Sequence, residues 1–108
     1  MAGRAVRFFL AHMSFLLPVE RLRETDTLLA FHHPRPSYPL HILILPKRDL
    51  ANFLALGVSD ADFLGDLVQV VQSLARDFDL EAHGYRLITN GGRYQDVPHL
   101  HFHLISEV

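Results

Sequence analysis

The sequence predicts an α+β domain in which one antiparallel sheet packs against one long helix. The chain has 108 residues, 49% of them hydrophobic, so it is long enough for about one domain and too apolar for intrinsic disorder. Five short apolar segments have the composition of β-strands, and one longer segment has the spacing of an amphipathic helix. Strands and helices do not alternate strictly, which favours antiparallel pairing. We therefore expect a single domain over residues 1–108.

The N-terminal segment is expected to form a short helix that ends before Pro18. Arginines followed by an apolar stretch resemble a signal peptide, but His12 and Ser14 interrupt the stretch and no small-residue cleavage site follows. The stretch is also far shorter than the ~20 residues of a membrane span, so we expect no membrane partner.

Three strands are expected next. Residues 19–23 and 27–31 flank a short polar segment, which indicates a hairpin. Residues 33–39 contain three prolines, which cannot donate to a β-ladder, and are expected to form a loop. The apolar run at residues 41–45, ended by Pro46, predicts a central strand.

The long helix is expected at about residues 60–78, where apolar residues recur at steps of three and four. Ser59 followed by Asp62 resembles its capping signal. Residues 85–89 and 99–105 are expected to be the last two strands, with residues 90–96 turning between them.

The amino-acid composition limits which classes of molecule the chain is expected to bind. Ten Lys and Arg against twelve Asp and Glu give a net charge of −2, with no basic run, so long nucleic acids are not expected to bind. The absence of cysteine excludes disulfides and thiolate metal sites and fits a reducing, cytoplasmic location. Eight phenylalanines in so short a chain leave apolar surface after folding, which favours self-association.

The last predicted strand carries three histidines. Because side chains alternate between the two faces of a strand, His99, His101 and His103 are expected on one face, opposite Leu100, Phe102 and Leu104. Neighbouring imidazoles suppress one another's ionisation, so at least one should be neutral and nucleophilic near neutral pH.

A metal site is the rival interpretation. On a regular strand His99 and His103 stand about 13 Å apart, too far to share one zinc ion. A site built from His101, His103 and His41 stays possible, so the residues alone leave both chemistries open.

The histidine strand resembles the signature of the histidine triad (HIT) superfamily of nucleotide hydrolases and transferases, His-φ-His-φ-His-φ-φ, where φ is apolar. The resemblance covers nearly the whole chain, from about Phe9 to Ile105. It includes the segments Glu24-Thr25-Asp26, Leu29-Ala30-Phe31, Leu45-Pro46-Lys47 and Gln95-x-Val97-x-His99, together with Pro36, His41 and Asn90.

The resemblance implies a five-stranded HIT-like sheet, a homodimer, and covalent chemistry without a cofactor or metal. It implies that His101 attacks an α-phosphate and forms a nucleotidyl-histidine that water resolves, with His99 and His103 supporting the site. A neutral His101 also needs an acceptor for its other ring nitrogen, for which we expect a backbone carbonyl.

The resemblance also implies a set of substrate-binding residues. His41 and Gln95 would contact phosphate together with His103, Asn90 would lie near the nucleotide, and Phe9 and Phe31 would contact base or ribose. Plainer interpretations stay open: Asn90 as a turn former, Phe31 as core, Gln95 as a loop residue and His41 as a structural histidine.

Three positions depart from the family pattern. His33 stands where many relatives carry an aspartate that binds both ribose hydroxyls, and a neutral imidazole offers only one acceptor and one donor. Asp96 stands where relatives commonly have Ser or Thr. Asp49 replaces another usual histidine, and we assign Asp49 no catalytic role.

Three functions follow from these observations. The first is a hydrolase that cleaves a nucleoside monophosphate, with AMP the expected one, from a small leaving group. The second is a nucleotide-binding sensor or interaction module of the same fold with little turnover. The third is a metal-dependent enzyme built on the histidines.

Overall fold

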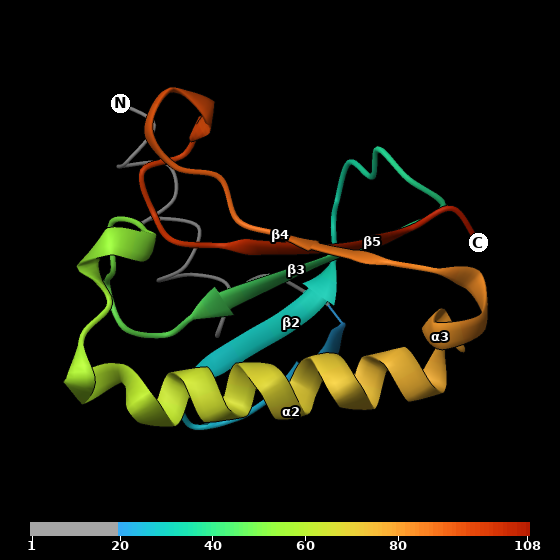
Figure 1. The fold of residues 1–108 in the computed structure, drawn as a ribbon, viewed down its shortest axis with the longest axis horizontal. Helices are drawn as coiled ribbons and strands as arrows, with labels where there is room; N and C mark the ends of the chain where they lie inside the picture. The colour runs from blue at the N-terminus through green and yellow to red at the C-terminus, as the bar shows by residue number, and fades with distance from the viewer. Residues whose placement is uncertain (1–19) are drawn as a thin grey trace.

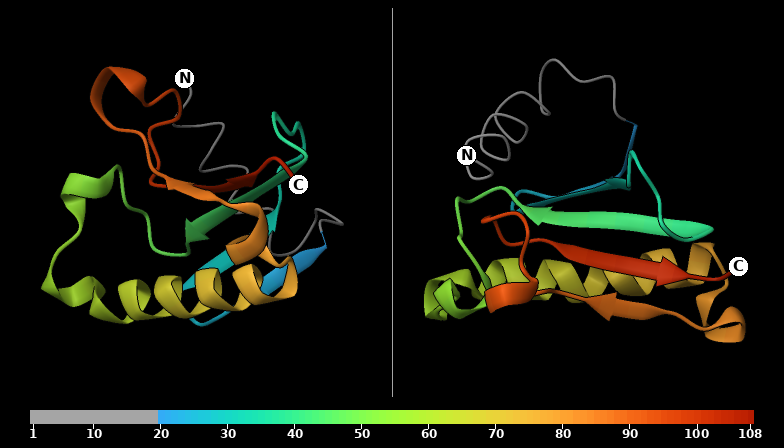
Figure 2. Two further views of the ribbon diagram at one scale, coloured as in Figure 1. Left: turned by 45° about the vertical axis from the view of Figure 1, so that its right-hand side comes forward. Right: turned by 90° about the horizontal axis from the view of Figure 1, so that it is seen from above.

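The computed structural model describes residues 20–108, which form one five-stranded antiparallel sheet covered on one face by a long helix (Figure 1). Figure 2 shows the same two layers from two further sides. The strands are β1 (Arg21–Glu24), β2 (Leu28–His32), β3 (Leu40–Pro46), β4 (Arg86–Ile88) and β5 (Phe102–Ser106). Their order in the sheet is β1-β2-β3-β5-β4, and every neighbouring pair is antiparallel. The predicted fold class is confirmed. The predicted N-terminal helix and Phe9 lie outside the described residues.

The helices are α2 (Ala61–Asp77) and the short α3 (Leu80–His83). Single 3-10 turns are η1 (Phe53–Ala55), η2 (Val58–Asp60) and η3 (Gly92–Tyr94). The sequence did not indicate α3 or these turns, because segments of three or four residues are too short to show a hydrophobic period.

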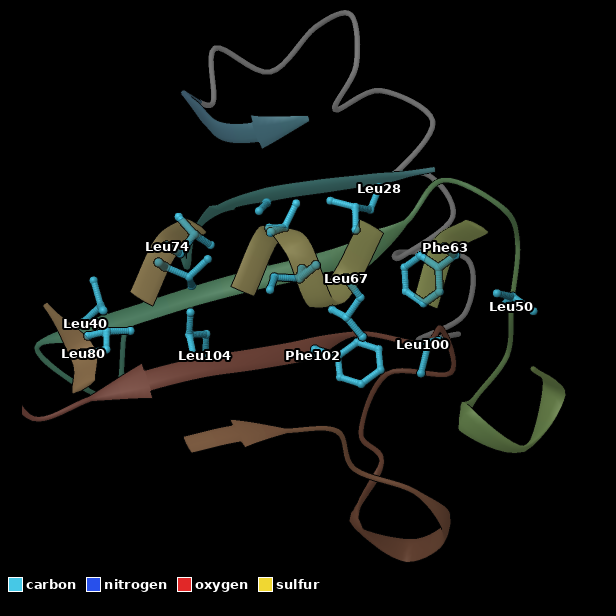
Figure 3. Packing of buried hydrophobic residues seen from close by; sticks show 14 residues of the cluster. Leu28, Leu40, Leu50, Phe63, Leu67, Leu74, Leu80, Leu100, Phe102 and Leu104 are labelled. Atoms are coloured by element: carbon cyan, nitrogen blue, oxygen red, sulfur yellow. The ribbon is translucent and has the colours of Figure 1, made fainter. Parts of the chain in front are cut away.

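The core lies between α2 and one face of the sheet (Figure 3). Along α2 the buried residues are Phe63, Leu67, Val70 and Leu74, which share one side of a helix with 3.6 residues per turn. They pack against alternate residues of the two central strands, namely Leu40, Ile42 and Ile44 on β3 and Phe102 and Leu104 on β5. The period-two alternation leaves His41, Leu43 and His103 on the opposite face of the sheet.

The hairpin between β1 and β2 closes through Thr25. Its hydroxyl oxygen accepts hydrogen bonds from the backbone N–H groups of Thr27 and Leu28, both at 3.1 Å. A side-chain oxygen that accepts from amides two and three residues on is a common turn device. The hairpin predicted around Glu24–Asp26 is therefore present, with strands shifted by one or two residues.

Two local expectations were wrong. Asp60, and not Ser59, is the N-cap residue of α2, and its carboxylate accepts from Gly57 N–H at 3.0 Å and from Arg48 at 2.7 Å. The final strand begins at Phe102 and not at residue 99, because the chain bends at residues 96–99 before it joins the sheet.

Within residues 20–108, no helix is both long enough and apolar enough to span a lipid bilayer.

Candidate active site

His41 and His103 meet on the face of the sheet that α2 leaves uncovered. They lie on the adjacent strands β3 and β5, where Leu43 is paired with His103 and His41 with Ile105. Nε2 of His41 is 2.8 Å from Nδ1 of His103. The strand pairing thus converts two positions 62 residues apart in sequence into one hydrogen-bonded imidazole pair.

The proton positions in this pair follow from a backbone amide. Ser37 N–H can only donate, and it donates to Nδ1 of His41 at 3.0 Å. Nδ1 of His41 is therefore unprotonated, so its Nε2–H is the donor to Nδ1 of His103. A neutral His103 then carries its proton on Nε2.

His101 has the opposite arrangement. Its Nδ1 is 2.7 Å from the backbone oxygen of His99, and a carbonyl oxygen can only accept. The ring therefore holds a proton on Nδ1, so that in the neutral ring Nε2 keeps a free lone pair. The expectation that a backbone carbonyl holds the second nitrogen of His101 is confirmed. The Thr89 hydroxyl donates to the His101 backbone oxygen at 2.8 Å, which anchors the residue to the chain after β4.

A small pocket opens beside these rings. Its volume is about 190 Å³, and it is lined by His33, Pro34, Leu43, Leu45, Val97, His101 and His103. The rings of His101 and His103 are 5.0 Å apart at an interplanar angle of 71°. The lining thus combines an apolar wall with three imidazoles, and within the described residues it contains no carboxylate.

His33 joins the imidazole cluster from the proline-rich loop. The Arg35 N–H donates to its Nδ1 at 2.9 Å, which leaves the proton of a neutral ring on Nε2. Its ring lies 4.4 Å from that of His41 and 6.2 Å from that of His103, nearly parallel to the latter. The position that departs from the family pattern is therefore part of the pocket wall.

Burial and mutual repulsion favour the uncharged form of three of these histidines, His33, His41 and His103. Desolvation is the main cause that lowers the pKa of His103 from 6.5 to about 4, and the nearby rings of His101, His41 and His33 contribute to the same shift. Desolvation is also the main cause of the lowered pKa values of His33 and His41. His33, His41 and His103 are accordingly neutral near neutral pH.

His99 does not share the pocket with the other two histidines of the run. Its side chain is 1% exposed and lies at the bend before β5, not on the strand, so the expected row of three rings on one strand face is wrong for this residue. Nδ1 of His99 is 3.5 Å from a carboxylate oxygen of Asp49. Its contribution to the site comes through its backbone oxygen.

Three further predicted residues lie outside the pocket lining. The Gln95 amide donates to the backbone oxygens of Ala51 at 2.8 Å and Val97 at 3.0 Å, so it ties two loops together. Phe31 is 1% exposed within β2, and Asn90 is half-buried after β4. We did not predict the apolar wall of the pocket from the sequence, although Leu43 and Leu45 follow His41 at the two-residue period that would have identified it.

Among residues 20–108, no group of three or more His, Cys, Asp or Glu side chains is arranged to hold a metal ion.

Comparison with known proteins assigns the chain to one family. Residues 17–108 match the family model described as HIT domain. The chain is 37% identical over 92 residues to an uncharacterized HIT-like protein of Synechococcus elongatus, covering 83% of this chain and 80% of that protein. Its fold is similar to that of a HIT family hydrolase from Clostridium thermocellum, with a TM-score of 0.82, 35% identity and coverage of 94% and 90% of the two chains. A HIT family hydrolase from Legionella pneumophila has a TM-score of 0.79 at 31% identity, with coverage of 90% and 88%.

The lowered pKa values predict acid destabilisation. As the pH falls from about 6.5 to about 4, the unfolded chain binds a proton at His103 that the folded chain does not, so the free energy of unfolding decreases. Urea denaturation across this range should show a shallower decrease for His103→Asn, which keeps an acceptor near the position of Nδ1. His83→Gln, which removes an exposed histidine outside the pocket, is the control. An equally steep decrease in His103→Asn would contradict this account.

Proposed function

Because the chain belongs to the HIT domain family, we propose that it is a nucleotide hydrolase that releases a nucleoside monophosphate, with AMP as the first candidate, from a small leaving group. The observation that carries this proposal is the 2.7 Å contact between Nδ1 of His101 and the His99 backbone oxygen. In the neutral ring this contact leaves Nε2 of His101 unprotonated beside the pocket, which is the state that a nucleophilic imidazole needs.

The reaction has two steps. Nε2 of His101 attacks the α-phosphorus, a P–N bond forms, and the leaving group departs with the electron pair of its bond to phosphorus and takes a proton from water. Water then attacks the same phosphorus, the P–N bond breaks, its electron pair returns to Nε2, and the proton of the attacking water passes to solvent.

His103 has the complementary role in this proposal. Its Nε2–H, fixed by the relay from Ser37 through His41, is a donor for the nonbridging oxygens on which charge develops. A donor whose orientation is set before substrate binds needs no reorganisation during the reaction. In this proposal His101 therefore supplies the attacking lone pair, and His103 supplies a hydrogen-bond donor to the phosphate oxygens.

A nucleotide-binding module with little turnover is the second candidate. The observation that favours it is Gln95, whose amide group donates to two backbone oxygens and so has both N–H groups engaged. Calorimetry with AMP and GMP beside activity assays separates the candidates, because a sensor binds nucleotide without releasing product.

We expect His101→Ala to abolish turnover. With adenosine phosphoramidate or adenylyl-lysine as substrate, removing the nucleophile should lower kcat at least about a thousandfold, while AMP binding persists. Rapid quenching and mass spectrometry of the parent should find adenylate on His101. His83→Ala is the control, and activity of the parent should survive EDTA, which addresses the metal-dependent alternative. Equal turnover by parent and His101→Ala would remove His101 from the mechanism.

We expect His33 to weaken the preference for ribose. A neutral His33 offers one Nε2–H donor, whereas an aspartate can accept hydrogen bonds from two hydroxyl groups. His33→Asp should raise the ratio of kcat/KM for the ribonucleoside over the 2'-deoxyribonucleoside phosphoramidate about tenfold, since each such interaction is worth about 1.4 kcal/mol. The ratio is the readout because a general loss of activity cancels in it. An unchanged ratio would separate His33 from sugar recognition.

We propose that two copies pair through the edge strand β4. This strand is paired only with β5 in the described residues, and two large side chains here, Tyr85 directly before the strand and Leu87 within it, are 52% and 40% exposed. Sedimentation velocity at micromolar concentration should show a dimer for the parent and a monomer for Leu87→Glu. Leu54→Glu, a change at a residue that is 89% exposed on η1, should stay dimeric. A monomeric parent would contradict the proposal.

A further inference from the structure

The ring of His99 is buried without a hydrogen-bond partner, at the bend before β5 whose backbone holds His101. Its side chain is 1% exposed, and neither ring nitrogen makes a hydrogen bond within residues 20–108. A buried polar group without a partner costs free energy, so a native structure that keeps one usually has a reason for it. The groups around the ring are therefore informative.

One segment, from Pro46 at the end of β3 to Leu50 in the loop that follows, supplies the polar surroundings of His99. A carboxylate oxygen of Asp49 lies 3.5 Å from Nδ1 of His99, and the backbone oxygen of Pro46 also favours the protonated ring. The Leu50 backbone oxygen accepts from Leu100 N–H at 2.7 Å. The same short segment thus faces the ring of His99 and holds the residue that follows it.

The backbone of His99 is what positions the nucleophile. Its carbonyl oxygen accepts the Nδ1 proton of His101, and this contact leaves Nε2 of His101 free to attack. Ring and carbonyl belong to one residue, and the ring is 1% exposed, so close packing couples a displacement of the ring to the backbone that carries the carbonyl. A displacement of about 1 Å in such an arrangement can reduce a rate about a hundredfold.

We propose that Asp49 is a positioning residue, whose carboxylate holds the buried ring of His99 and thereby keeps His101 in the tautomer with Nε2 unprotonated. From the sequence we assigned Asp49 no catalytic role, and the 50 positions between it and His99 give no sign of the contact. Asp49 does not line the pocket, so it acts through His99 and not on substrate. The kinetic consequence rests on the proposed hydrolase function, whereas the tautomer of His101 does not.

The electrostatics of the ring support this placement. Burial lowers the pKa of His99, while the Pro46 carbonyl and the Asp49 carboxylate act in the opposite direction. The titratable groups that face His99 are Asp49, from the loop after β3, and His101, from its own segment, and a charge on His101 lowers the pKa further. Asp49 is thus the titratable group among them that offsets the desolvation of this ring.

The test is the tautomer of His101, read by long-range proton–nitrogen NMR of the full chain labelled with nitrogen-15 at histidine. The parent should show His101 as the Nδ1–H form. Asp49→Asn should give a mixture of the two tautomers and a lower pKa for His99, and Asp49→Glu should restore most of the Nδ1–H form. Asp26→Asn, which removes an exposed carboxylate in the β1–β2 turn, is the matched control. An unchanged His101 tautomer in Asp49→Asn would overturn the proposal, whatever happens to the pKa of His99.

The kinetic readout separates positioning from substrate binding. Asp49→Asn should lower kcat about tenfold with KM unchanged, because only the orientation of His101 is affected. A rise in KM at constant kcat would instead place Asp49 in substrate binding and contradict the proposal. Asp49 is 63% exposed, so both variants should fold, which thermal melting checks. If the parent itself turns over no nucleotide, the hydrolase proposal fails while the NMR comparison still decides the role of Asp49.

Discussion

The candidate site depends on one hydrogen bond, from Nδ1 of His101 to the backbone oxygen of His99. An imidazole in water exchanges its proton between two nitrogens, and a ring protonated on Nε2 has no lone pair to offer the pocket. A carbonyl oxygen cannot donate, so a contact of 2.7 Å removes that freedom. The position of one backbone oxygen thus fixes which side of the ring is reactive.

The tautomer of the neighbouring His103 is set by a backbone N–H group, a donor, and not by a carbonyl oxygen. An amide at Ser37 sets His41, and His41 sets His103, so that His103 presents a proton where His101 presents a lone pair. In both cases the backbone group that sets the tautomer lies in an irregular segment. It is the proline-rich loop for His103 and the bend at residues 96–99 for His101. Regular strand pairing brings the rings together, and these loops decide their protonation.

This division between strand pairing and loop contacts explains how much of the site could be predicted from the sequence. The period of two along the last strand correctly placed His103 on the face opposite Phe102 and Leu104, because strand geometry determines it. His101, the residue directly before β5, lines the same pocket as His103. The same rule failed at His99, since a bend that precedes the strand leaves no mark in the hydrophobic pattern. The five-stranded fold followed from apolar periodicity and turn residues, with strand boundaries shifted by a few residues.

What sequence could not supply was the partner of each polar group. The amide of Gln95 reaches Ala51, and the carboxylate of Asp49 faces His99, across chain separations of 44 and 50 residues. Such contacts depend on how the loop after β3 packs against the segment before β5. A motif match assigns roles to residue types at fixed positions, but it carries no information about which donors are already engaged.

The loop after β3 contributes both to the hydrophobic core and to the position of His99 and His101. Leu50 and Leu100 are both almost completely buried in the core cluster, and the Leu50 oxygen accepts from the Leu100 N–H. Leu100 stands between His99 and His101, so the packing that stabilises the domain also holds the two histidines in register. A hydrophobic contact of this kind resists displacement because protein interiors are close-packed. The orientation of the nucleophile is thus maintained by the core itself, and a substitution that loosens this corner of the core should disturb the site before it unfolds the protein.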